Sequence, residues 1–229
     1  MRESRRLTLL ALLVVGVAGL LQIAARRTPA VPTTSYRVDA ATARRDHVPV
    51  LPAGVRAATF RFAPGTAPGD RDAFLAAVAD ARPPARRLID LVDGLVDVRV
   101  GSTGEAKAIG LTESNGDRYV VTVDFATVAR RFGRRGIDRV VLHELGHVVD
   151  FAIVPQDVRT RLDAGIPTGY GCDEGVSGAC ADEAERFAES FAKWATGDIG
   201  ADLYIGYKVL PPSPTLDAWG APLAGLGRG

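Results

Sequence analysis

The sequence predicts an α+β domain in which a small mixed sheet packs on helices. Alternating apolar and polar residues at 96–100 and 119–123 predict two half-buried strands, and a weaker strand is expected between them at 108–112. Apolar residues then recur with helical spacing at 138–151 and at 182–196. Strands followed by helices, without a regular strand–helix alternation, are typical of α+β domains.

The segment before these strands predicts one short strand and two helices. Residues 57–62 are expected to form the strand, and Asp70 is expected to cap a helix that runs through Asp80. The proline pair at 83–84 interrupts the helical pattern, so a second helix is predicted from there to Gly94.

The remaining elements are recognised by their ends. Asp124 is expected to cap a helix with one apolar face, and Gly133 is expected to end that helix. The C-terminal stretch carries three prolines between 211 and 214. They predict an irregular tail, anchored in the core by Trp219.

The N-terminal residues 1–30 predict a targeting segment. Several arginines among the first six residues precede the apolar run 7–23, which is long for a signal peptide and short for a membrane span. A cleaved signal peptide and an N-terminal membrane anchor through 7–23 are both consistent with this pattern. Either way, the protein is predicted to be extracytoplasmic, secreted or anchored. Residues 31–55 predict a linker, and 56–229 the folded domain.

The two cysteines agree with export. Cys172 and Cys180 lie in one glycine-rich loop and are expected to form a disulfide in an oxidising compartment. The alternative is a metal site that uses both cysteines. It would need further soft ligands, and His47 stands alone in the predicted linker.

Charge and composition exclude one class of partner. The formal net charge is +1, and the arginine pairs at 86–87 and 134–135 are offset by nearby aspartates. No basic stripe interleaved with aromatic residues is present, so nucleic acid is not expected as a partner.

The strongest chemical signal is an HExxH motif, which spans 143–147. Two of the chain's three histidines, His143 and His147, lie one helical turn apart and project from one face of the predicted helix. This spacing suits two imidazoles that share a tetrahedral zinc ion, so one Zn²⁺ is the expected cofactor. Glu144 lies about 100° round the helix from His143. It is expected to act as general base on a zinc-bound water.

Zinc requires a third protein ligand, and no histidine follows the motif. Asp150 is the nearest carboxylate, but seven residues of continuous helix separate it from His143 by about 10 Å. Asp150 is therefore expected to support the site from outside the ligand set, or to anchor the end of the helix.

The predicted helix 182–196 offers a better third ligand. Glu185 and Glu189 lie four residues apart on one shoulder of its apolar stripe, while Arg186 and Lys193 are expected to face water. Glu185 is the predicted ligand. Glu189 is predicted to accept a hydrogen bond that orients a histidine.

Two segments together resemble a known family. The residues His-Glu-Leu-Gly-His-Val-Val-Asp at 143–150 and Glu-Ala-Glu-Arg-Phe-Ala-Glu-Ser-Phe at 183–191 resemble the catalytic domain of anthrax lethal factor-like metallopeptidases, which include clostridial Pro-Pro endopeptidases. The resemblance implies a zincin fold of the gluzincin type, with Glu185 as zinc ligand. It also implies that a tyrosine, here Tyr170, stabilises the oxyanion. Tyr204 and Tyr207 remain alternatives.

These observations predict an exported zinc-dependent metalloendopeptidase, with a zincin-like catalytic domain at 56–229 and a peptide or protein as substrate. The resemblance further implies that an extended substrate pairs with the strand at 118–124. It does not extend to toxin activity, because the chain lacks room for the toxin's other domains. The alternative function is a non-enzymatic zinc-binding or cell-envelope interaction module on the same fold.

Overall fold

The structure is a computed structural model, and it describes residues 33–37, 60–105, 108–167, 181–200, 203 and 209–226. Several predictions concern residues outside these ranges. They are the targeting segment 1–30, the disulfide between Cys172 and Cys180, and the tyrosines Tyr170, Tyr204 and Tyr207. Among the described residues, no helix is both long enough and apolar enough to cross a membrane.

The strands of the described residues form one five-stranded mixed sheet, in the order β1-β4-β5-β3-β2. β4 and β5 are antiparallel, and the other neighbouring pairs are parallel. The predicted α+β class with a small mixed sheet is therefore confirmed. The strands are β1 (Thr33–Arg37), β2 (Arg61–Phe62), β3 (Val96–Val100), β4 (Ala108–Asn115) and β5 (Arg118–Val123).

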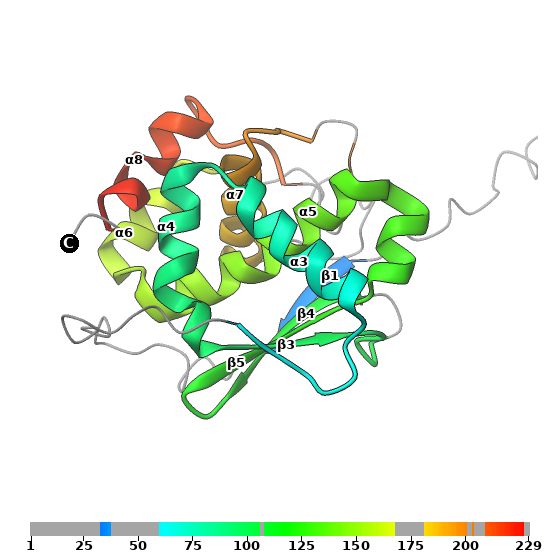
Figure 1. Cartoon of the computed structure of the whole chain (residues 1–229). Helices are drawn as coiled ribbons and strands as arrows, with labels where there is room; N and C mark the ends of the chain where they lie inside the picture. Colours follow the sequence, from blue (N-terminus) through cyan, green and yellow to red (C-terminus); the bar gives the residue numbers. More distant parts are fainter. Residues whose placement is uncertain are drawn as a thin grey trace, which may run out of the picture. The chain divides into compact units, whose positions relative to one another are not determined.

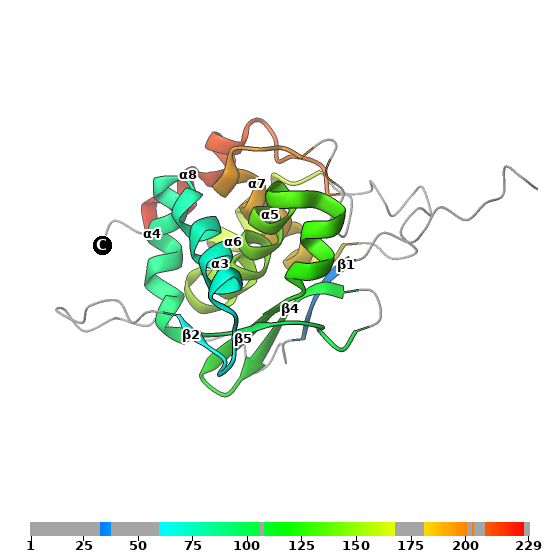
Figure 2. The same cartoon turned by 45° about the vertical axis from the view of Figure 1, so that its right-hand side comes forward.

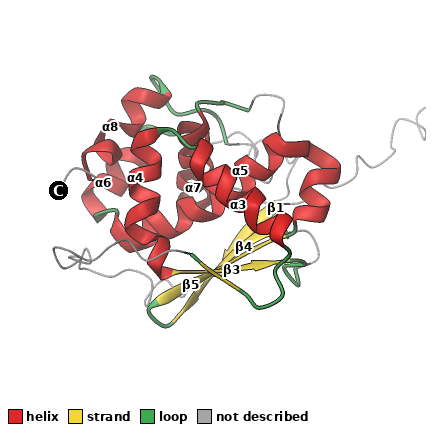
Figure 3. Ribbon diagram, in the orientation of Figure 1, coloured by secondary structure: helices red, strands yellow, loops and turns green. Residues whose placement is uncertain are grey.

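Helices cover one face of this sheet (Figures 1 and 3). Two of them were not predicted, α6 and α8, and α8 forms despite an internal Pro222. α8 packs beside α4 and α7, as Figure 2 also shows. The helices are α3 (Pro68–Asp80), α4 (Pro83–Val92), α5 (Phe125–Ile153), α6 (Gln156–Ala164), α7 (Glu183–Thr196) and α8 (Leu216–Leu226), with a 3₁₀ turn at Asp93–Leu95.

The C-terminal tail is thus partly helical rather than irregular. Trp219 of α8 is buried, and its indole Nε1 donates a hydrogen bond to the carbonyl oxygen of Leu162 at 3.0 Å. The predicted anchoring role of Trp219 is confirmed. The proline-based prediction failed beyond residue 214 because burial of an apolar face stabilises a helix that local propensity does not favour.

The hairpin β4–β5 is longer than predicted. A two-residue turn connects Asn115 to Arg118, and Gly116 adopts a φ of 65° within it. A tight hairpin turn of this kind favours glycine because it requires positive φ. The turn lets β4 continue three residues past the predicted end at 112, so it pairs with the whole of β5.

Strand β1 lies within the predicted linker 31–55, so the domain boundary at 56 leaves out one strand. It pairs in parallel with β4, with Ser35 opposite Leu111.

The predicted pairing of the strand 118–124 with an extended substrate is wrong. β5 lies between β4 and β3, and both of its backbone edges are already hydrogen-bonded within the sheet.

Helix α5 joins the two helices predicted on either side of Gly133. Asp124 caps its first turn, because the Asp124 carboxylate accepts a hydrogen bond from the backbone N–H of Thr127 at 2.9 Å. Gly133 has a φ of 64° and a ψ of −160°, which interrupts the helical geometry without ending the element. The second part of α5 carries the HExxH motif.

The second part of α5 packs closely against α7. A Cβ atom added to Gly146 would lie 3.1 Å from the Cα atom of Ala188 and 3.2 Å from its carbonyl oxygen. The absence of a side chain at Gly146 permits this backbone approach. Because Gly146 lies inside the motif, the approach brings α7 next to the histidines.

We expect the substitution Gly146→Leu to lower the free energy of unfolding by about 1–3 kcal/mol, since it overpacks a rigid helix–helix contact. Chemical denaturation measures this change. Gly69→Leu is the control, because Gly69 is an exposed helical glycine with no heavy atom within 4 Å of the added Cβ. Equal stability of the Gly146→Leu protein and the native protein would show that the contact is not close in solution.

Candidate metal centre

Both ends of helix α7 are defined by capping residues. At its start, the Asp182 carboxylate accepts a hydrogen bond from the backbone N–H of Glu185 at 3.0 Å. At its end, Gly197 adopts the left-handed conformation, with a φ of 69°, that commonly ends a helix. With the helix fixed between these residues, Glu185 and Glu189 lie one turn apart on the side facing α5.

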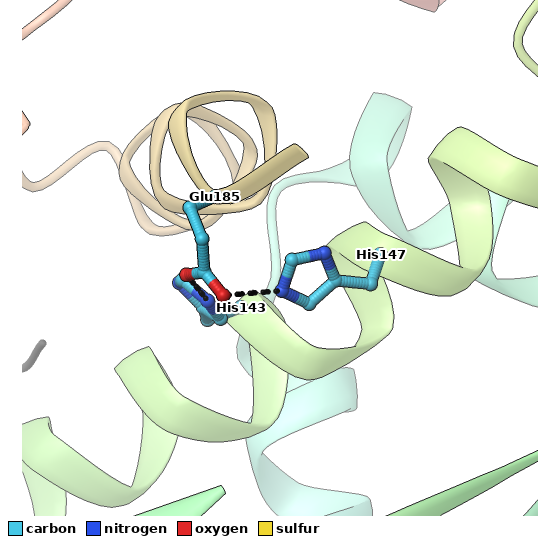
Figure 4. A group of neighbouring side chains, drawn as sticks. All are labelled: His143, His147 and Glu185. Carbon is cyan, nitrogen blue, oxygen red and sulfur yellow. Dashed lines mark hydrogen bonds and ion pairs between the residues drawn. The ribbon is translucent and has the colours of Figure 1, made fainter. Parts of the chain in front are cut away.

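Three of the predicted site residues come together between α5 and α7. His143 and His147 project from α5, and Glu185 reaches from α7 toward both (Figure 4). Glu185 Oε2 lies 3.1 Å from His143 Nε2, and Oε1 lies 3.7 Å from His147 Nε2. One ring nitrogen of each histidine and one carboxylate oxygen of Glu185 all lie within 4.8 Å of one another, so the three residues could hold a metal ion.

The cluster is more deeply buried than the sequence predicted. An amphipathic helix was expected to bury one side and to present its histidines to a cleft. Instead His143, His147 and Glu185 are each at most 3% exposed. The reason is that α7 packs over the histidine side of α5, while the sheet and the other helices cover the apolar side.

Burial and mutual contacts shift the pKa values of all three groups. Burial disfavours charge on His143, but its hydrogen bonds with Glu185 and Glu189 outweigh this effect and raise the pKa of His143 to about 10. Burial, together with the nearby His143 charge, lowers the pKa of His147 well below its usual value. Burial raises the pKa of Glu185. The lowered pKa favours the neutral imidazole of His147, the form that can bind a metal, whereas the raised pKa of His143 describes the metal-free contacts with Glu185 and Glu189.

Glu144 of α5 lies close enough to this cluster for the charges of His143 and Glu185 to shift its pKa, and it contacts strand β4. The Thr112 hydroxyl of β4 donates a hydrogen bond to Glu144 Oε2 at 2.8 Å. Glu144 Oε1 is buried and has no hydrogen-bond partner among the described residues. Burial raises the pKa of Glu144 to about 8, against the opposing effects of the His143 charge and the Thr112 hydrogen bond.

Gly110 makes room for this side chain. A Cβ atom at Gly110 would overlap Glu144 Oε1. An isolated glycine within a strand often marks a close approach of another group, so this residue carried a sequence signal that was not used. Thr112, by contrast, has no signal in the sequence, because a threonine in a strand is ordinary.

Glu189 contacts His143 on the side away from Glu185. His143 Nδ1 donates to Glu189 Oε2 at 3.2 Å, while His143 Nε2 faces Glu185. Burial opposes the charge of Glu189, but Lys193, the His143 hydrogen bond and Arg139 lower its pKa to about 2. The prediction that Lys193 faces water is therefore wrong, since Lys193 is 4% exposed.

Asp150 contacts a different element. Its carboxylate accepts a hydrogen bond from Arg159 Nε of α6, and Arg159 Nη2 donates to the Asp150 backbone carbonyl at 2.7 Å. Both residues are buried. This contact joins the end of α5 to α6, and Asp150 does not belong to the group that could hold a metal.

Protein-family models, curated proteins and solved structures were each compared with the chain, and none matches. The donors of the cluster are two imidazole nitrogens and one carboxylate oxygen, with the unpartnered Glu144 Oε1 nearby. Such a set suits a divalent transition metal better than calcium or magnesium, which prefer oxygen ligands.

We expect Glu185→Gln to weaken metal binding by at least about 100-fold, because it removes the carboxylate ligand donated by α7. Glu183→Gln, two residues away in the first turn of the same helix, should bind metal as the native protein does. Competition with a chromophoric chelator measures both affinities. Equal affinities of the two variants would exclude Glu185 as a ligand.

Proposed function

We propose that this protein is an exported zinc-dependent metalloendopeptidase of the gluzincin type. The observation that carries the proposal is the environment of Glu144. One of its oxygens is fixed by Thr112, the other is buried without a partner among the described residues, and the carboxyl lies close enough to His143 and Glu185 for their charges to shift its pKa. A purely structural metal site does not require such an additional carboxylate, because protein ligands fill all four of its coordination positions.

The proposed metal fits the residues present. Two histidines and one glutamate are the ligand set of several catalytic zinc sites, which keep a fourth position open. A zinc ion held by His143, His147 and Glu185 would polarise a peptide carbonyl and lower the pKa of water in that position.

The chain's own residues would then move the proton. In its ionised form, which a bound cation would favour over the neutral carboxyl that burial favours, Glu144 would accept a proton from the attacking water on Oε1, because Oε2 is already bound to Thr112. The same oxygen would pass the proton to the nitrogen of the leaving amine. Gly110 leaves the space in which Oε1 lies, and burial excludes bulk water that would compete for the proton.

Two further parts of the proposal concern residues outside the described ranges. Tyr170 is the proposed donor to the oxyanion, with Tyr204 and Tyr207 as alternatives, because a neutral phenol suits that role. Export rests on the pattern of residues 1–30.

We expect Glu144→Gln to retain metal binding and to lower kcat for peptide cleavage by about 10²–10⁴-fold, because glutamine cannot accept the proton. The assay incubates the full chain, loaded with zinc, with a peptide library and identifies the products by mass spectrometry. Glu183→Gln is the control for charge loss. A metal-loaded native protein that cleaves no peptide would favour the non-enzymatic zinc-binding module instead.

Gly110→Ala tests the position of Glu144 without changing its chemistry. The added methyl would displace the flexible carboxylate end rather than the backbone, so the protein should fold and bind metal normally. We expect kcat to fall about 10²-fold, because small displacements of a catalytic group have large effects on rate. Unchanged kcat in this variant would argue that Glu144 adopts another position during catalysis.

A further inference from the structure

Two buried cations converge on a single oxygen of Glu189. Arg139 Nη1 donates to Glu189 Oε1 at 3.1 Å, and Lys193 Nζ donates to the same oxygen at 2.9 Å. The other oxygen, Oε2, accepts from His143 Nδ1 at 3.2 Å. Each oxygen of this carboxylate therefore has a separate partner set, with cations on one side and the histidine on the other.

Both cations are fixed by a second contact. Arg139 Nη2 donates to the backbone carbonyl of Asp198 at 2.6 Å, and Lys193 Nζ donates to the backbone carbonyl of Val209 at 2.7 Å. These carbonyls belong to the chain beyond α7. Each cation thus bridges Glu189 to a backbone atom, so the carboxylate cannot rotate without breaking charge-assisted hydrogen bonds on both sides.

The arrangement is costly for a purely structural feature. Arg139 is 1% exposed, and its Nε has no hydrogen-bond partner among the described residues. Lys193 is also buried, with an exposed fraction of 4%. Buried charges of this kind are often replaced by apolar side chains without loss of stability, so their presence calls for a role other than stabilising the core.

That role follows from the orientation of His143. Because Oε2 is fixed as an acceptor of the Nδ1 hydrogen, a metal that displaces one ring proton of His143 would find the lone pair on Nε2, which faces Glu185 and the candidate centre. We propose that Arg139 and Lys193 are positioning residues for the metal centre, and that they act on His143 through Glu189. The inference rests on the metal centre of the proposed function but not on peptide cleavage.

A double-mutant cycle tests the route of this effect. Arg139→Met and Lys193→Met should each weaken binding of Co²⁺ by about 10-fold, the lower end of the range for residues that support metal ligands. In a Glu189→Gln background, either substitution should change the affinity by less than about twofold, because the carboxylate through which the cations act is gone. Competition with a chelator gives the affinities.

Several controls separate positioning from folding. Arg134→Met removes an exposed arginine from the same helix and should leave Co²⁺ affinity unchanged. Arg139→Lys retains a cation and should recover most of the affinity. The visible absorption of bound Co²⁺ should change in Arg139→Met and Lys193→Met, because ligand geometry changes, and a change in stability alone would leave it unaltered.

Three outcomes would overturn the inference. They are unchanged affinity in both single variants, an equal loss of affinity with and without the Glu189 carboxylate, and an unaltered Co²⁺ spectrum. If one cation variant does not fold, the cycle built on the other cation decides. If the cycle shows coupling but no peptide is cleaved, the proposed peptidase function fails while the positioning role stands.

Discussion

The close approach of α5 and α7 at Gly146 and Ala188 is the constraint on which the candidate site depends. A metal held by two helices needs their backbones near enough for short side chains to share it. The absence of a side chain at Gly146 permits this approach. Glu185 then reaches both histidines, since its oxygens lie 3.1 Å and 3.7 Å from their Nε2 atoms.

The same approach creates an electrostatic problem. It buries His143, Glu144, Glu185 and Glu189 together, and charged groups are costly to bury unless they are paired. Opposite charges from both helices reduce this cost, because Arg139 of α5 and Lys193 of α7 both donate hydrogen bonds to Glu189. Burial also raises the pKa values of Glu144 and Glu185, which lowers the cost of burying them, and the raised pKa of His143 adds a positive charge beside Glu185.

The sheet contributes through its strand β4. Gly110 and Thr112 of that strand set the position of Glu144, one by leaving space and the other by a hydrogen bond. β5 has no free edge to offer a peptide, because it is paired on both sides. The position of Glu144, the proposed general base, thus depends on Thr112, which lies 32 residues earlier in the chain, and not only on the helix that carries Glu144.

Local patterns were enough to predict the strands 96–100 and 119–123, the break at Gly133 and the spacing of His143 and His147, because neighbouring residues produce these features. Glu185 and Glu189 could be selected because helical periodicity places them on one face. Helix α8, strand β1 and the burial of Lys193 could not, since each is stabilised by residues distant in sequence. The roles of Gly110, Thr112 and Arg139 likewise arise from contacts between elements. Sequence periodicity specifies which side of a helix a residue occupies, whereas tertiary packing specifies which other residues that side contacts.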